Sequence, residues 1–273
     1  KDTCSFTSDT EYSGVYDTSD YMIALDPAKG IQFICESAVG ELNRCVFDAG
    51  SNTRKVMDIR NVPEGETISF SGFVIKNGKT TSTGGGMALV NSNAIIDNTL
   101  FYNNVAERGG GLYVQGGTVI LKNCEFNSCT STHGGGFGGG GIFSAGAGHL
   151  DIYGTAFVAN AASNAVFKDI HNTNSGGMIE IHADCFLPGY APTAPTVGSA
   201  LAVAGTYFEG PMKSYGRCEV CADGTVKSLT DSSSCHPVAA LVCPDGEKVG
   251  VGSSSFWHIA DCTSPAPTSA PSP

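Results

Sequence analysis

The titratable side chains of this sequence come closest together near residue 170, where Asp169 and His171 are followed by His182 and Asp184. Imidazole and carboxylate groups within hydrogen-bonding reach of one another perform general acid–base chemistry. Because no other titratable residues come so close together, these four are the best catalytic candidates in the chain. A hydrolytic site would need all four groups on one face of the protein. A coincidental grouping on the surface is the simpler explanation, and we expect no catalytic residues and no enzyme.

Two other segments have the composition of a binding site but lack essential residues. The glycine-rich run from Gly134 to Gly141 has neither the Lys-Ser/Thr pair of a phosphate-binding loop nor the Asp of calcium-binding repeats. Cys218 and Cys221 have the C-x-x-C spacing of zinc and redox sites, without a second close Cys/His pair or a thioredoxin-like pattern. We therefore expect no metal ion and no cofactor.

The 11 cysteines indicate an oxidising compartment and therefore an extracellular protein. Cys35 and Cys45 flank a turn at Gly40, and we expect them to form a local disulfide; Cys124 and Cys129 flank Phe126 and could also pair. The remaining expected disulfide cysteines are Cys185, Cys218, Cys221, Cys235, Cys243 and Cys262. The odd count leaves one thiol free or bonded to another chain, and Cys4 is the candidate.

The elements that position these residues follow from a repeat. Three glycine triplets begin at Gly84, Gly109 and Gly134, about 25 residues apart, which is a period typical of stacked solenoids. Short alternating apolar runs recur with this period and predict strands that are too short to be helices. The predicted strands are 68–70, 95–96, 119–121, 150–152 and 179–181.

Bulky residues at equivalent positions should lie above one another, roughly 4.8 Å apart, in the core of such a stack. The same alignment places Asp97 and Lys122 in one outer column, where we expect an ion pair between coils rather than an acid–base set. The predicted core column contains Ile75, Phe101, Phe126, Phe157, Phe186 and Phe208.

The combination of Gly-Gly-Gly-apolar with Phe-x-x-Asn resembles the right-handed parallel β-helix repeats of pectin-lyase-like proteins. It is most similar to the surface repeats of polymorphic outer-membrane proteins. The matching residues are 109–112, 139–142, Phe101 with Asn104, and Phe157 with Asn160. The chain departs from the pattern at Cys129, which replaces the Asn after Phe126, and at Phe186, which is followed by Leu-Pro-Gly.

This resemblance implies an all-β, right-handed parallel β-helix, but it leaves the activity open, because such folds include lyases, hydrolases, adhesins and structural proteins. The lyases hold Ca²⁺ with clustered acids and use Arg or Lys as the base. Basic residues are sparse between residues 68 and 210 of this chain, and Arg108 directly follows Glu107, as in a local ion pair.

Changes in composition divide the chain into a cap segment (1–30), the β-helix (31–210), a cysteine-rich disulfide module (211–262) and a Pro/Ser/Thr-rich tail (263–273). Hydroxyl residues beside proline in extended backbone are typical O-glycan acceptors, although a bare linker has the same composition. The candidate O-glycosylation sites are Thr193, Thr196, Thr263, Ser264, Thr268, Ser269 and Ser272.

The net charge of −11 argues against a nucleic-acid partner, and no apolar run is long enough to span a membrane. These features favour a secreted, non-enzymatic structural glycoprotein that carries covalent glycans and associates with itself or with other surface proteins. A cell-surface adhesin or carbohydrate-binding module is the first alternative, with Tyr102, Tyr113 and Tyr153 as sugar-stacking residues. A polysaccharide lyase or hydrolase is the second.

Overall fold

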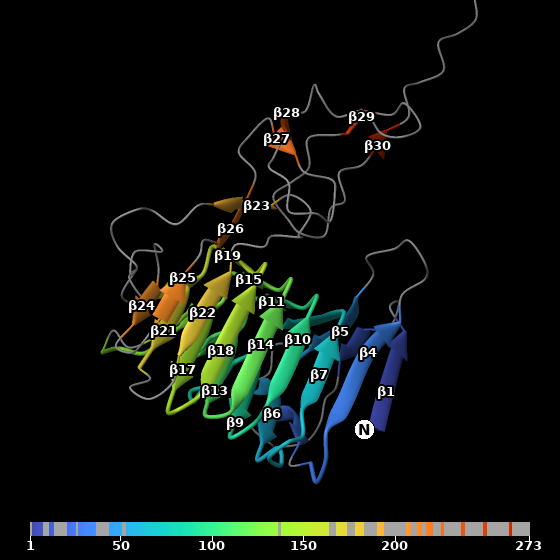
Figure 1. Cartoon of the computed structure of the whole chain (residues 1–273), viewed down its shortest axis with the longest axis vertical. Helices are drawn as coiled ribbons and strands as arrows, with labels where there is room; N and C mark the ends of the chain where they lie inside the picture. Colours follow the sequence, from blue (N-terminus) through green and yellow to red (C-terminus); the bar gives the residue numbers. More distant parts are fainter. Residues whose placement is uncertain are drawn as a thin grey trace, which may run out of the picture.

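Short parallel strands lie one above another and form a β-solenoid in the computed structural model of the chain (Figure 1). No helix occurs among the described residues. The described residues are 2–7, 11–13, 21–25, 27–36, 44–50, 53–135, 138–163, 168–173, 178–182, 190–193, 206–208, 212–214, 217–220, 225–226, 236–237, 248–249 and 262–263.

Three long sheets enclose the core, and along most of the stack each successive coil contributes one strand to each sheet. At the far edge of sheet B, the strand at residues 190–193 instead pairs antiparallel with the strand at residues 217–220. Sheet A is β1 (Asp2–Thr7), β4 (Ile31–Glu36), β7 (Ile68–Ser71), β10 (Ala94–Asp97), β14 (Thr118–Lys122), β18 (His149–Tyr153), β22 (Ile179–His182) and β25 (Met212–Ser214). Sheet B is β2 (Glu11–Ser13), β5 (Cys45–Asp48), β8 (Phe73–Lys76), β11 (Leu100–Tyr102), β15 (Glu125–Asn127), β19 (Ala156–Val158), β26 (Arg217–Val220) and β23 (Tyr190–Thr193). Sheet C is β3 (Tyr21–Leu25), β6 (Lys55–Arg60), β9 (Met87–Val90), β13 (Leu112–Gln115), β17 (Ile142–Ala145), β21 (Ile170–Asn172) and β24 (Thr206–Phe208).

Smaller sheets complete the described structure. Three two-residue strands, β12 (Val105–Ala106), β16 (Thr130–Ser131) and β20 (Ala161–Ala162), extend the stack beside sheet B. Antiparallel pairs join β27 (Thr225–Val226) to β28 (His236–Pro237) and β29 (Lys248–Val249) to β30 (Cys262–Thr263).

The alternation of apolar and polar residues in sheet A follows the pleat of the strands. In β10, β14, β18 and β22 the aliphatic residues are buried at every second position, and the residues between them lie on the outer face. The five strands predicted from the sequence are all present in this sheet. The same alternation therefore produces both the core and the regular outer columns of side chains.

The predicted core column is confirmed from Ile75 to Phe157. The backbone register of sheet B aligns Ile75, Phe101, Phe126 and Phe157 in sequence. The Phe101 and Phe126 rings stack with centroids 4.6 Å apart, and the Phe126 and Phe157 rings with centroids 5.4 Å apart. Phe208 does not belong to this column, because it lies in β24 of sheet C, opposite Asn172. Phe186 lies outside the described residues.

The glycine triplets are required where sheet C begins. The first glycine has a positive φ of 64° at Gly109, and at Gly110 a Cβ atom would lie only 2.5 Å from the backbone oxygen of Thr130 in the next coil. The third triplet was placed wrongly, however. Ile142 pairs with Leu112, so that Gly139 rather than Gly134 follows Gly109 in the repeat. The intervening coil contains additional residues at its turn.

Two predicted boundaries are also corrected. Strands β1, β2 and β3 pair in parallel with β4, β5 and β6, so that the solenoid already includes the segment predicted as a cap. At the other end, β25 joins sheet A and β26 joins sheet B, although both lie in the segment predicted as a separate cysteine-rich module. The tail beyond Thr263 lies outside the described residues.

Candidate functional site

Ionisable side chains gather on the outer face of sheet A at β18 and β22. Leu150 and Ile152 of β18 point into the core, so that His149, Asp151 and Tyr153 face outward. In β22 the buried residues are Ile179 and Ile181, which leaves Glu180 and His182 on the same outer face. The five outward residues, His149, Asp151, Tyr153, Glu180 and His182, are called the β18–β22 cluster below.

The parallel register brings the members of this cluster together. Asp151 lies directly beside Glu180, and Tyr153 lies beside His182. His149 Nε2 is 3.0 Å from Asp151 Oδ1, and His182 Nε2 is 3.9 Å from Glu180 Oε2. The rings of Tyr153 and His182 stack with centroids 4.1 Å apart and planes 5° apart. All five side chains are half-buried, so the cluster is in contact with solvent but held in place by its neighbours.

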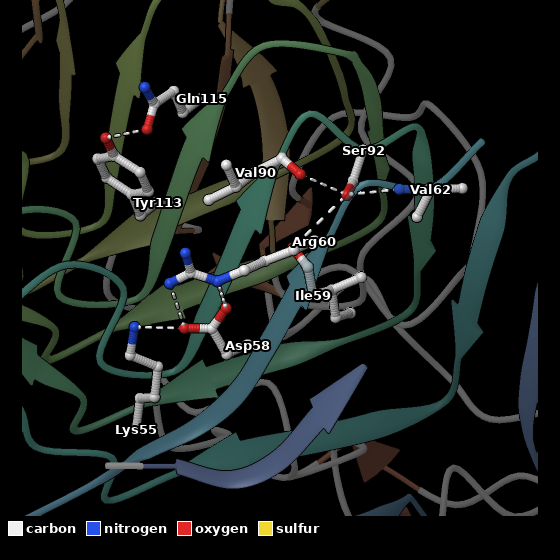
Figure 2. Close-up of polar contacts among 9 residues, drawn as sticks. All are labelled: Lys55, Asp58, Ile59, Arg60, Val62, Val90, Ser92, Tyr113 and Gln115. Carbon is white, nitrogen blue, oxygen red and sulfur yellow. Dashed lines mark hydrogen bonds and ion pairs between the residues drawn. The ribbon is translucent and has the colours of Figure 1, made fainter. Parts of the chain in front are cut away.

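A second polar cluster lies on sheet C, where Figure 2 shows Asp58 between two cationic side chains of β6. Arg60 Nε donates to Asp58 Oδ1 at 2.6 Å, and Lys55 Nζ donates to Asp58 Oδ2 at 2.7 Å. Burial opposes the ionisation of Asp58, but these hydrogen bonds outweigh burial and hold its pKa below the ordinary value. A carboxylate with both oxygens occupied by cations is a structural ion pair rather than a general base.

Aromatic residues continue along sheet C beside this ion pair. The register aligns Asp58, Ala88, Tyr113, Phe143 and His171 in one outer column. Tyr113 donates to Gln115 Oε1 at 3.0 Å, as Figure 2 shows, and its ring stacks on that of Phe143 at 5.8 Å. The column is buried although it lies outside the main core, and its chemistry is that of packing.

The predicted catalytic group is not assembled. His171 lies in sheet C and His182 in sheet A, on different faces of the solenoid. Asp169 is buried and accepts a hydrogen bond from the side chain of Asn160 at 3.1 Å. Burial lowers the pKa of His171 to about 4, with the positive charge of Arg108 adding to the effect. Asp184 lies outside the described residues. The proximity of these residues in sequence is therefore not proximity in space.

The cysteine predictions divide into one success and one error. Cys35 and Cys45 form a disulfide, as expected. Cys124 and Cys129 are buried free thiols and do not pair. They stand at opposite ends of β15, where the extended backbone separates them by roughly 3.3 Å per residue, beyond the Cα–Cα distance that a disulfide spans.

The other cysteines are described only in part. Cys218 is also disulfide-bonded. The backbone of Cys4 and Cys262 lies in strands β1 and β30. The side chain of Cys4 and the other predicted disulfide cysteines, Cys185, Cys221, Cys235 and Cys243, lie outside the described residues.

The residues predicted for sugar stacking and O-glycosylation differ in how exposed they are. Tyr102 is exposed, with 43 % of its surface accessible, whereas Tyr113 is buried and cannot stack against a sugar. Tyr153 is half-buried against His182. Among the candidate O-glycosylation sites, Thr193 and Thr263 end the strands β23 and β30. The remaining candidates lie outside the described residues.

His149, Asp151 and Glu180 were not among the residues predicted from the sequence as site candidates. The alternation of apolar and polar residues in β18 and β22 predicts which side chains face outward, and it could have identified these three residues. Asp97 and Lys122 share a register position in sheet A, and the ion pair expected between them stays a prediction. The side-chain amide of Asn123 donates to Asp97 at 3.3 Å.

Comparison with protein-family models, with curated proteins and with solved structures finds no match. Within the described part of the chain, no helix has the length and apolar character needed to cross a membrane. The fold class, an all-β parallel solenoid, is thus established by the structure itself.

Proposed function

We propose that this chain is a secreted, non-enzymatic structural glycoprotein, a β-helical building block of an extracellular fibre, surface appendage or cell wall. The observation that carries the proposal is the continuous stack of parallel strands, arranged in three sheets around one apolar core, with an antiparallel strand only at the far edge of sheet B. Within this proposal, the chain is a right-handed, pectin-lyase-like β-helix of the polymorphic outer-membrane-protein type. The cysteine content and the Pro/Ser/Thr-rich segments support secretion and glycosylation.

The polar groups of the stack favour a scaffold over an active site. Asp58 is held by Lys55 and Arg60, and Asp48 accepts hydrogen bonds from the side chain of Asn77 at 2.8 Å and the backbone of Gly50 at 2.7 Å. Asn77 in turn accepts from Asn103 at 2.8 Å, so that the side chains form a ladder between coils. Such contacts hold successive coils in register and make the stack stiff.

The end strands provide the surfaces for assembly. Each of β1, β2 and β3 has one neighbour among the described strands, as have β25 and β24 at the opposite end. The outer edge of such a strand presents backbone N–H and C=O groups that accept a further parallel strand. Head-to-tail addition of a second copy would extend sheets A and C, and repeated addition produces a filament.

The test is the assembly state of the purified 273-residue chain, measured by sedimentation velocity and negative-stain microscopy. Thr3→Lys and Ser5→Lys in β1 place charges on the edge strand and should reduce the sedimenting assemblies to monomer. Thr118→Lys, on the exposed outer face of the central strand β14, is the matched control and should assemble normally. A wild-type protein that remains monodisperse at high concentration would refute the proposal.

One observation favours carbohydrate binding as the second candidate. Tyr102 is exposed on sheet B, and the register places Lys76 and Asn127 on either side of it. An exposed aromatic ring between polar side chains is suited to stacking against a sugar. Binding on a glycan array that is lost in Tyr102→Ala and retained in Tyr153→Ala would support this function.

A further inference from the structure

We infer that the β18–β22 cluster binds a divalent transition-metal ion, with Asp151, Glu180 and His182 as the protein ligands. The cluster contains one imidazole and two carboxylates whose ligand atoms all lie within 4.8 Å of one another. This donor set suits Zn²⁺ and neighbouring divalent ions of the first transition series. The inference is independent of the proposed structural role, and the sequence alone predicted no metal site.

The spacing of the ligand atoms is close to that of a coordinated ion. Nitrogen and oxygen ligands about 2.0–2.2 Å from a tetrahedral Zn²⁺ lie about 3.3–3.6 Å from one another. The three side chains therefore need to close by on the order of 1 Å, which small χ rotations on the solvent-facing side of a sheet allow. Because they come from adjacent parallel strands, the backbone already fixes their relative positions.

Two carboxylates lie side by side in this outer column, and Lys213 of β25 stands at the next register position, beside Glu180. Earlier coils place Ile95 and Ile120 at the register positions that Asp151 and Glu180 occupy later in the stack. Replacing two stacked isoleucines with two carboxylates sets like charges directly opposite each other, which is unfavourable in a sheet. A divalent ion between the carboxylates removes this repulsion.

His149 and Tyr153 act as positioning residues. His149 Nε2 lies 3.0 Å from Asp151 Oδ1 and orients that carboxylate, as outer hydrogen-bonding partners of metal ligands generally do. The Tyr153 ring stacks on His182 and fixes the plane of its imidazole.

The experiment is isothermal titration of the chelator-treated 273-residue protein with Zn²⁺. Asp151→Asn, Glu180→Gln and His182→Ala should each weaken binding at this site at least tenfold, and His149→Ala should weaken it by about 10–100-fold. Asp97→Asn on the same face of sheet A and His133→Ala elsewhere are the matched controls, and both should bind as the wild type does. Thermal unfolding without metal verifies that each variant folds.

Cobalt distinguishes this site from the cysteines. Co²⁺ bound by the cluster should show the weak visible bands of nitrogen and oxygen ligands, without thiolate-to-metal charge transfer. The inference is overturned if the wild type does not bind Zn²⁺ in the titration, or if binding is unchanged in Asp151→Asn and His182→Ala. In either case the cluster consists of histidine–carboxylate pairs alone.

Discussion

Buried asparagines at equivalent positions of successive coils form a ladder that Cys129 interrupts. Replacing Cys129 with asparagine should stabilise the protein. Asn104 Nδ2 donates to the carbonyl of Ile75 at 2.8 Å, and its Oδ1 accepts from the backbone N–H of Gly78 at 2.9 Å. Asn160 repeats the arrangement further along the stack, bonding to Phe126 O and Cys129 N at 3.0 Å each. Each amide thus satisfies one donor and one acceptor of the preceding coil.

Cys129 occupies the same position between these two asparagines, with a weaker hydrogen-bonding group. Its Sγ is 3.4 Å from the carbonyl of Phe101, and the sulfur, a weak acceptor, lies 4.0 Å from the side-chain Nδ2 of Asn104. Cys129→Asn replaces both contacts with amide hydrogen bonds in a site of similar volume. At about 0.5–1.5 kcal/mol net for each bond, the expected gain in unfolding free energy is about 1.5 kcal/mol.

The assay is urea denaturation with calorimetry of the wild type and the variant. A gain of this size corresponds to an increase in Tm of about 3–6 °C for a chain of this length. Cys129→Ala is the control, because it removes the sulfur and leaves the carbonyl of Phe101 without this partner. An unpaired buried carbonyl costs about 1–3 kcal/mol, and Cys129→Ala should lose stability by that amount. A decrease in stability of Cys129→Asn would refute the reasoning.

Three further predictions follow from buried groups. Because burial lowers the pKa of His171 to about 4, the unfolded chain binds a proton before the native state does as the pH falls, and the wild type should lose up to about 3 kcal/mol between pH 6.5 and 4. His171→Phe should lose less over this window in urea titrations. Burial also raises the pKa of the Cys124 and Cys129 thiols to about 12, so iodoacetamide should label them at pH 8 only after unfolding, as read by peptide mass spectrometry. Gly110→Ala should destabilise the fold by several kcal/mol in the same denaturation assay, whereas Gly134→Ala, with open space at its Cβ, should be neutral.

Each of these predictions has a specific contradicting result. Parallel pH–stability curves for the wild type and His171→Phe would show that this histidine does not contribute to the dependence on pH. Labelling of the two thiols in the native protein within minutes would mean that they are accessible to solvent. Equal stability of the two glycine variants would contradict the close approach of neighbouring coils at Gly110.

The sequence predicts the architecture because the fold repeats a local rule. A strand of sheet A buries every second residue, and the bulky residue after the turn stacks on its equivalents, as Phe101 and Phe126 do. The rule fails where the chain departs from the period. Additional residues before Gly139 shift the next repeat, and Phe208 enters sheet C because the chain between β22 and β24 does not follow the 25-residue spacing.

The outer face is harder to predict, because packing does not constrain it and neighbours in space are set by register alone. Asp169 and His171 are close to His182 in sequence, yet His171 lies in sheet C and His182 in sheet A, on different faces of the solenoid. Asp151 and Glu180 are far apart in sequence and adjacent in space, since one coil of the stack separates them. Identifying the cluster requires the register of each coil, and that register depends on the number of residues in every turn before it. A change in the length of one turn therefore moves candidate ligands relative to one another without disturbing the core, which is how one solenoid can hold either inert ladders or a metal site.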